Sequence, residues 1–177
     1  MKSIKTGLAV LLATVAILFS TPGKASVLDA IGSFYIPNST LQLEQEVRCL
    51  ARNIFYEAGA EPYKGKLAVG LVTVNRARSN KFKADTVCSV VKQKAVVRGK
   101  PVCQFSWYCS GKAYAEIPIN TKGYQESLAA AKKILLHDYT MPGFRNAFNF
   151  HAVTASPSWR HDKTIVERIG NHIFYRD

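Results

Sequence analysis

Residues 49–78, CLARNIFYEAGAEPYKGKLAVGLVTVNRAR, place an acidic residue, Glu57, at the end of an apolar helical run. The apolar residues around it recur at spacings of three and four, the period of an amphipathic helix with one face in a core. They are Leu41, Val47, Leu50, Ile54, Phe55 and Ala58. With Ser39 as the N-cap and Gly59 after the last turn, the sequence predicts a helix over about residues 40–58.

The position of Glu57 favours general acid catalysis. Glu57 follows Phe55 and Tyr56 within the last turn of the predicted helix. A carboxyl group beside aromatic surface is desolvated, which raises its pKa and keeps it protonated near neutral pH. The alternative is a solvated glutamate at a fraying helix end, just before the loop of residues 59–62.

Similar patterns predict three further helices. The second begins near Pro62 and ends near Arg78, and Gly65 and Gly70 inside it permit a close approach to the first helix. Its apolar stripe consists of Leu67, Leu71 and Val74. A short helix follows, capped by Asp85 or Thr86, and another covers about residues 122–137. We therefore expect a mainly helical protein.

Residues 92–122 show no sustained periodicity, and cationic side chains alternate there with aromatic ones. Long loops in compact domains are often functional, so this composition suits a binding loop. A surface loop with its aromatic residues tucked beneath it is an equally good interpretation.

The C-terminal part has the pattern of a small sheet. Residues 146–151 alternate, which predicts a strand with Phe148 and Phe150 on one side and with Asn149 and His151 on a solvent-exposed side. Residues 164–169 and 172–176 are β-rich and flank Gly170-Asn171, a strong hairpin signal. Helices followed by a small antiparallel sheet predict the α+β class, in a single mainly helical domain over residues 39–177.

The N-terminus has the pattern of a secretory signal peptide. Lys2 and Lys5 precede an uncharged run over residues 7–19, and a small-residue cleavage site ends at Ala25. We expect residues 1–25 to be a signal peptide and residues 26–38 to be a lead-in segment, so that the protein is exported to the periplasm or cell exterior. An uncleaved N-terminal anchor is the alternative. After cleavage of the signal peptide we expect no stable membrane insertion.

Removal of residues 1–25 would take away three lysines and no acidic residue, lowering the formal charge from +12 to +9. A basic exported protein is attracted to polyanions, among them the acidic cell-wall polymer, an anionic membrane surface or nucleic acid. Export favours the first two. We expect no nucleic-acid partner and a monomeric protein.

Four cysteines lie beyond the predicted signal peptide. An even number of cysteines in an exported chain suggests two disulfides. Only five residues separate Cys103 from Cys109, so we expect these two to close a small loop and Cys49 to pair with Cys88. The alternative is a metal site with histidine ligands, but no C-x-x-C or H-x-x-x-H spacing is present. We expect no metal and no cofactor.

Several separated motifs, in order along residues 47–176, closely resemble the SleB/CwlJ family of cell-wall hydrolases, which includes spore cortex-lytic enzymes. They occupy residues 51–62, 65–69, 74–76, 86–91, 103–107, 146–151, 157–159 and 169–176. The resemblance implies cleavage of peptidoglycan glycan strands at the MurNAc–GlcNAc bond by a lysozyme-like core, with Glu57 as the catalytic acid. The chain departs from the family at Gly59-Ala60, where relatives commonly have Arg-Gly, and at Asn149, where many have Tyr.

The resemblance also suggests substrate-binding residues, each with a structural alternative. Tyr56 contacts sugar or covers the acid, Asn75 binds substrate or satisfies backbone groups, and His151 binds substrate or is structural. The loop between Cys103 and Cys109 is expected to line the groove with Gln104, Phe105, Ser106 and Trp107, while Trp159 is expected to pack.

Most glycosidases use two carboxylates, and no convincing partner for Glu57 is evident. Glu61 lies beyond the Gly59 break, and Glu116 and Asp138 cannot be positioned. One acid suffices if a hydroxyl of the substrate is the nucleophile, so we expect a lytic transglycosylase. The alternatives are a muramidase-type hydrolase, a non-catalytic cell-wall-binding protein and, well behind these, an exported nucleic-acid-binding protein.

Overall fold

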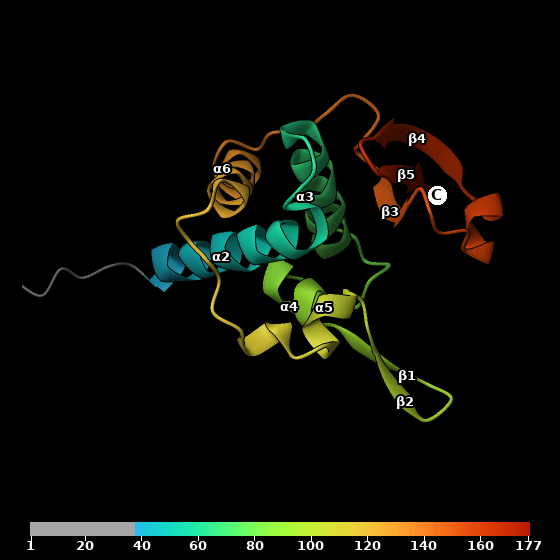
Figure 1. Ribbon diagram of the computed structural model, residues 1–177, viewed down its shortest axis with the longest axis horizontal. Coiled ribbons are helices and arrows are strands. Elements are labelled where there is room, and N and C mark those ends of the chain that lie inside the picture. The colour runs from blue at the N-terminus through green and yellow to red at the C-terminus, as the bar shows by residue number, and fades with distance from the viewer. Residues whose placement is uncertain (1–37) are drawn as a thin grey trace, which may run out of the picture. The chain divides into compact units, whose positions relative to one another are not determined.

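The structure, a computed structural model, describes residues 38–177 and has the expected α+β arrangement (Figure 1). The predicted signal peptide and all but the last residue of the lead-in segment lie outside the described residues. The helices are α2 (Asn38–Ala58), α3 (Tyr63–Arg78), α4 (Val87–Lys92), α5 (Ser106–Cys109) and α6 (Lys122–Leu136), with 3-10 helices η1 (Lys112–Tyr114) and η2 (Ser158–Asp162). The strands are β1 (Lys94–Val97), β2 (Lys100–Cys103), β3 (Ala147–Ala152), β4 (Thr164–Ile169) and β5 (His172–Arg176).

Helix α3 is the centre of the fold. Every residue from Gly65 to Val74 is buried, because α2, α4, α6 and β3 all pack against this helix (Figure 1). Gly70 permits the predicted close approach: a Cβ atom there would lie 2.9 Å from Cδ1 of Ile54 on α2 and 2.6 Å from Cδ1 of Ile134 on α6. The polar residues of α3 are therefore enclosed as well, which determines what they can contact.

The C-terminal sheet is antiparallel, in the order β3-β5-β4. The predicted hairpin at Gly170-Asn171 is confirmed, and Gly170 adopts the left-handed φ of +56° that favours glycine in such turns. Strand β3 has a register shift between Ala147 and Asn149. One face of the sheet carries Phe150 and Phe174, and this face packs with Phe144 in the core.

Residues 94–103 form a hairpin, β1–β2, that the sequence did not predict. Arg98 and Gly99 at its turn have φ angles of +51° and +76°, as in the turns that match the twist of antiparallel strands. All but one of the strand residues are exposed, and Cys103 is half-buried. A hairpin without a buried face has no need for alternating polarity, so its sequence lacks the period of a strand.

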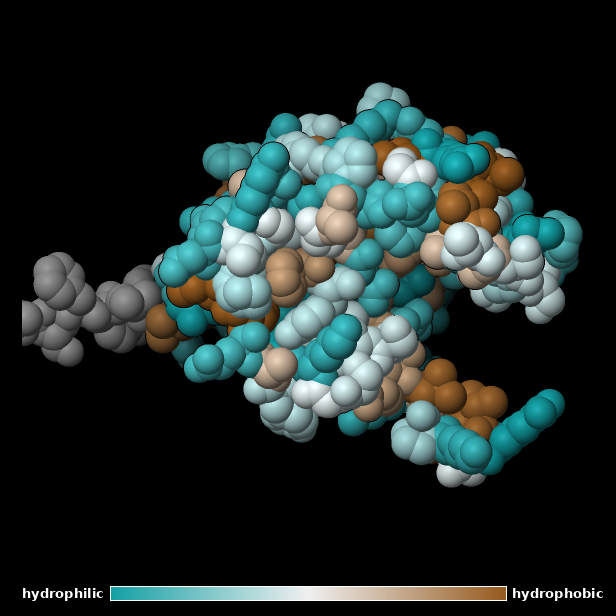
Figure 2. All heavy atoms as spheres, in the orientation of Figure 1, coloured by the Kyte–Doolittle hydropathy of each residue, from teal (hydrophilic) through white to brown (hydrophobic). Residues whose placement is uncertain are grey.

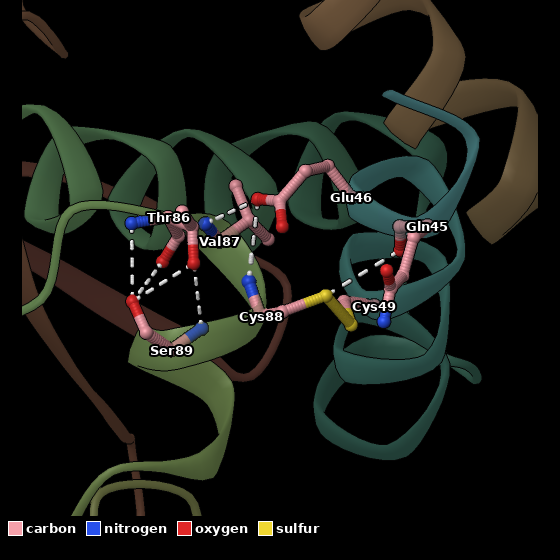
Figure 3. Close-up of a disulfide and its surroundings, with 7 residues drawn as sticks. All are labelled: Gln45, Glu46, Cys49, Thr86, Val87, Cys88 and Ser89. Atoms are coloured by element: carbon pink, nitrogen blue, oxygen red, sulfur yellow. Dashed lines mark hydrogen bonds between the residues drawn. A yellow bond between two sulfur atoms is a disulfide. The ribbon is translucent and has the colours of Figure 1, made fainter. Parts of the chain in front are cut away.

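Both predicted disulfides are present. Cys49–Cys88 joins α2 to α4, and Cys103–Cys109 joins the end of β2 to α5. Figure 3 shows the first with its surroundings: Thr86 caps α4 by accepting the N–H of Ser89, and the Glu46 carboxylate accepts the N–H of Val87. The start of α4 is thus held to α2 by one covalent bond and one charged group.

Replacing Cys49 and Cys88 with alanine is expected to lower the free energy of unfolding by about 4 kcal/mol, because the bond closes a long loop in the unfolded chain. The two cysteines are 39 residues apart, against 6 for Cys103 and Cys109. Urea unfolding of oxidised protein measures the change. The matched Cys103→Ala/Cys109→Ala variant should lose only about 2 kcal/mol, and equal losses would contradict the loop-length argument.

Candidate active site

Glu57 lies in the last turn of α2, one turn beyond the buried Asn53 on the same side of the helix. Its side chain is partly exposed. Desolvation by burial raises its pKa from 4.5 to about 7, while the nearby charge of Arg76 lowers it. Among residues 38–177 no group donates a hydrogen bond to this carboxyl. Glu57 therefore holds its proton up to neutral pH, as the sequence interpretation expected of a general acid.

Arg76 is the charged neighbour of Glu57, and it comes from the central helix α3. Only 4% of its surface is exposed. Its Nε donates to the carbonyl oxygen of Phe148 on β3 at 2.7 Å, and its guanidinium lies 5.5 Å from the ring centroids of Phe82 and of Phe105. Burial lowers the pKa of Arg76 to about 10, and Glu57 opposes that shift. It remains charged at neutral pH.

These contacts place the Glu57–Arg76 pair where three parts of the protein meet. Arg76 contacts β3 of the sheet, Phe82 of the segment after α3, and Phe105 just before α5. Figure 2 shows a hollow in the surface, on the right, between the sheet with η2 and the β1–β2 hairpin. Arg76 thus joins β3 of the sheet to Phe105, the residue between the β1–β2 hairpin and α5.

A buried hydrogen-bond network supports α2 one turn before Glu57. The Nδ2 of Asn53 donates to Thr73 Oγ1 on α3 at 3.0 Å, and the indole Nε1 of Trp107 donates to Asn53 Oδ1 at 2.9 Å. Thr73 in turn donates to the carbonyl of Val69. The network connects three elements and leaves no polar atom of Asn53 unpaired, so it fixes how α2 sits against α3 and α5.

The Trp107→Phe variant should lose about 1–3 kcal/mol of unfolding free energy. Phenylalanine preserves an aromatic ring beside Tyr56 but removes the donor to Asn53, whose oxygen is then buried without a partner. Chemical denaturation measures the loss. Tyr108→Phe on the same helix is the control, since the Tyr108 hydroxyl makes no hydrogen bond within the described residues, and an equal loss there would contradict the interpretation.

Residues 60–175 match the family described as Cell Wall Hydrolase. This stretch is more than half of the chain. The chain belongs to the cell wall hydrolase family. The matched stretch begins three residues after Glu57.

The relatives of this chain include the spore cortex-lytic enzymes of Bacillus subtilis (strain 168), 26% identical over 155 residues, and of Oceanobacillus iheyensis, 27% identical over 131 residues. The alignments cover 88% and 74% of this chain but 44% and 41% of the relatives. The chain thus spans less than half the length of these curated proteins.

Two solved structures share the fold of this chain. The catalytic domain of the Bacillus cereus SleB protein aligns with a TM-score of 0.55 at 25% identity, over 82% of this chain and 98% of that one. The catalytic domain of SleB from Bacillus anthracis, described as a germination-specific lytic transglycosylase, aligns with a TM-score of 0.56 at 24% identity, over 80% and 100%. The predicted resemblance and the α+β class are confirmed.

Tyr56 is the predicted binding residue nearest to Glu57 in the chain. Its ring stacks on Trp107 with centroids 4.6 Å apart, and its hydroxyl donates to the carbonyl of Lys112 at 3.2 Å. Arg52 donates to the carbonyls of Lys112 and Ala115. Tyr56 is half-buried, so part of its surface stays accessible beside the acid.

The other predicted binding residues of α3 and α5 divide into exposed and buried ones. Asn75 donates to the carbonyls of Phe144 and Ala147, so it satisfies backbone groups. Phe105 is only 3% exposed and faces Arg76, so the expectation that it lines a groove is wrong. Gln104 and Ser106 on either side of it are exposed. Gln104 and Ser106 are therefore accessible to a ligand, and Asn75 is half-buried.

His151 is buried, at 8% exposure, and the prediction of a solvent-exposed face for it is wrong. Its Nε2 is hydrogen-bonded to the Tyr175 hydroxyl at 2.8 Å and its Nδ1 lies 2.8 Å from the carbonyl oxygen of Ala152. Its ring stacks on Tyr175, and Trp159 of η2 packs edge-on against both. The face of β3 expected to be wet is therefore covered by η2, and His151 is held as a structural residue.

The other acidic residues considered as partners of Glu57 are engaged elsewhere or exposed. The Glu61 carboxylate accepts the backbone N–H and the side-chain Nδ2 of Asn171 at 2.9 and 3.0 Å. Burial raises the pKa of Glu61, but these bonds and the charges of His172 and Lys66 outweigh it, so the net shift is downward. Asp138 pairs with Arg78 at the surface, and Glu116 is exposed.

Within residues 38–177 no cluster of three His, Cys, Asp or Glu side chains is placed to hold a metal ion. Nor is any helix in this range long and apolar enough to span a membrane.

Proposed function

We propose that this protein cleaves peptidoglycan glycan strands at the MurNAc–GlcNAc bond, as a lytic transglycosylase in which Glu57 is the single acid and base. The observation that carries the proposal is that burial raises the pKa of Glu57 to about 7. Family membership and the names of the relatives, spore cortex-lytic enzymes, support a cell-wall substrate.

One carboxyl group can perform the whole reaction if its roles follow in sequence. Protonated Glu57 donates its proton to the glycosidic oxygen as the bond from C1 of MurNAc to that oxygen breaks. The C6 hydroxyl of the same MurNAc attacks C1 of the oxocarbenium-like centre and gives its proton to the Glu57 carboxylate. The products are a 1,6-anhydro-MurNAc end and a free GlcNAc hydroxyl, and Glu57 is protonated again.

The pKa of about 7 suits both halves of this cycle, because a group with a pKa near the working pH can donate and accept with similar ease. Burial keeps the proton on Glu57 before the bond breaks. Buried and charged Arg76 favours the carboxylate that forms when the proton leaves. Burial thus stabilises the protonated form of Glu57, and Arg76 stabilises its carboxylate.

We further propose that the protein acts outside the cytoplasm, in the periplasm or at the cell exterior, as a monomer on glycan strands. The two disulfides support this, because disulfides persist in oxidising compartments.

Digestion of purified peptidoglycan followed by mass analysis of the fragments tests the proposal. Fragments with 1,6-anhydro ends are expected. Reducing ends would instead identify a muramidase-type hydrolase. Binding to walls without release of fragments would identify a non-catalytic wall-binding protein and rule out the proposed activity.

A further inference from the structure

One segment of the chain contains basic residues but no acidic ones. Residues 86–115 contain no aspartate and no glutamate. They contain five basic residues, namely Lys92, Lys94, Arg98, Lys100 and Lys112. The segment includes α4, the β1–β2 hairpin, α5 and η1, and three of the four disulfide cysteines lie in it. No acidic residue within this segment offsets its positive charge, although the Glu46 carboxylate of α2 meets the segment at the start of α4.

The hairpin of residues 94–103, called the arm below, carries this charge away from the core. Four residues in each strand give it a length of about 13 Å. In Figure 1 it projects from the helices, and in Figure 2 it forms the lower wall of the hollow. The disulfide from Cys103 to Cys109 fixes its base, together with a hydrogen bond from Gln104 N–H to the Gln93 carbonyl.

Two of the arm's cations are available to a ligand. Lys94 lies 5.3 Å from the ring centroid of Tyr108 and is engaged there. Arg98 and Lys100, at the turn, form no ion pair with any described residue. Their side chains are exposed, and the backbone conformation at Arg98 presents them at the tip. They can meet an anion without first breaking an internal contact.

The arm also carries apolar side chains that are exposed to solvent and do not pack in the core. Val96, Val97 and Val102 are 76%, 52% and 49% exposed. Paired residues share a face of the hairpin, so Val97 and Lys100 lie side by side on one face and Val96 and Pro101 on the other. Exposed apolar side chains next to cations indicate a surface for a ligand that is itself anionic and partly apolar.

We propose that the arm binds the peptide stems of peptidoglycan, holding their carboxylates with Arg98 and Lys100 and their alanine methyl groups with Val97 and Val102, which share the face of Lys100. This inference rests on the proposed function for the identity of the polymer. A glycan strand in the hollow would direct its stems outward toward the walls, one of which is the arm. A phosphate polymer would use the cations but has no counterpart for the valines, so the stems are the better fit.

Co-sedimentation with insoluble peptidoglycan tests the arm with the Arg98→Glu/Lys100→Glu variant. The control, Lys132→Glu/Arg168→Glu, reverses one lysine and one arginine that are exposed on α6 and β4. On walls with free stem carboxylates the arm variant should bind about tenfold more weakly than the control. Converting the carboxylates to primary amides should remove this difference.

Three results would overturn the proposal: equal binding by the two variants to untreated walls, a difference that persists on amidated walls, or a larger loss of affinity for an oligonucleotide than for walls. A Val97→Ser/Val102→Ser variant should bind both kinds of wall more weakly, since amidation leaves the alanine methyls in place, and unchanged binding would refute the apolar part. Binding is measured independently of cleavage. If the wild type binds walls but releases no fragments, the proposed activity is contradicted. The binding comparison still tests the role of the arm.

Discussion

Replacing Glu57 with glutamine is expected to lower the rate of peptidoglycan cleavage by roughly 10²–10⁴-fold or to abolish it, because glutamine has the same shape but no proton to transfer. The fold should be unchanged, since no hydrogen bond of the described structure involves the Glu57 side chain. Fragment release from purified walls measures activity, and circular dichroism checks the fold.

The same variant should be more stable than the wild type above neutral pH. A carboxyl group whose pKa rises on folding binds its proton more tightly in the folded chain, so the folded state loses stability as pH rises from 4.5 through about 7. Glutamine does not titrate and escapes this loss. The gain in unfolding free energy should reach up to about 3 kcal/mol at pH 8 and vanish near pH 4.

Glu116→Gln is the control for both measurements, because Glu116 is exposed and its replacement should change neither activity nor stability. A Glu57→Gln protein that still cleaves walls at the wild-type rate would place the acid elsewhere. One that is inactive but no more stable at pH 8 would show that Glu57 is not buried enough to hold its proton.

Replacing Arg76 with glutamine should move the alkaline limb of the pH–rate profile to higher pH. The charge of Arg76 lowers the pKa of Glu57, so its removal raises that pKa and lets the acid stay protonated in more alkaline solution. The variant should also lose about 1–3 kcal/mol of unfolding free energy, because the carbonyl of Phe148 loses its buried donor. Rates measured across pH and urea unfolding give the two effects separately.

Two further substitutions distinguish tuning of the acid from support of the fold. Arg76→Lys retains the charge but not the planar group between Phe82 and Phe105, so it should restore the position of the alkaline limb while remaining less stable than the wild type. Arg78→Gln, two residues along α3, removes a surface charge paired with Asp138 and should shift nothing. If all three variants keep the wild-type limb, Arg76 is a structural residue alone.

The elements with one buried face were predictable from the sequence. Helix α2 was expected at about residues 40–58 and spans Asn38–Ala58. It was predictable because its apolar residues recur on the side that packs against α3. The hairpin at Gly170-Asn171 and the cap at Thr86 were predictable from local turn and capping chemistry. Such signals depend on a few neighbouring residues, so they can be recognised without knowledge of the tertiary fold.

Tertiary contacts decided the cases in which the sequence interpretation was incomplete or wrong. The β1–β2 hairpin has no buried face and so no alternating pattern. His151 sits on the side of β3 that alternation assigns to solvent, but η2 returns to cover that side. Phe105 lies in a loop-like stretch whose pattern does not show that Arg76 is buried against it.

The sequence interpretation predicted a raised pKa for Glu57, the candidate acid, but missed Arg76 and the network of Asn53, Thr73 and Trp107. A signal for them was present. Residues 65–74 are apolar around the whole circumference of α3, as expected of a helix surrounded by others, so polar residues in or next to that run have to be enclosed and paired. The choice of partners depends on packing between elements distant in the chain.

The exposure of the arm also bears on how relatives of this protein can diverge. No side chain between its two ends contributes to the core, and a Cβ atom at Gly99 would meet nothing within 4 Å. Insertions, deletions and new charges at such a tip leave the packing of the helices untouched. Selection can therefore alter this wall of the hollow in many single steps while the acid and its buried arginine stay constant.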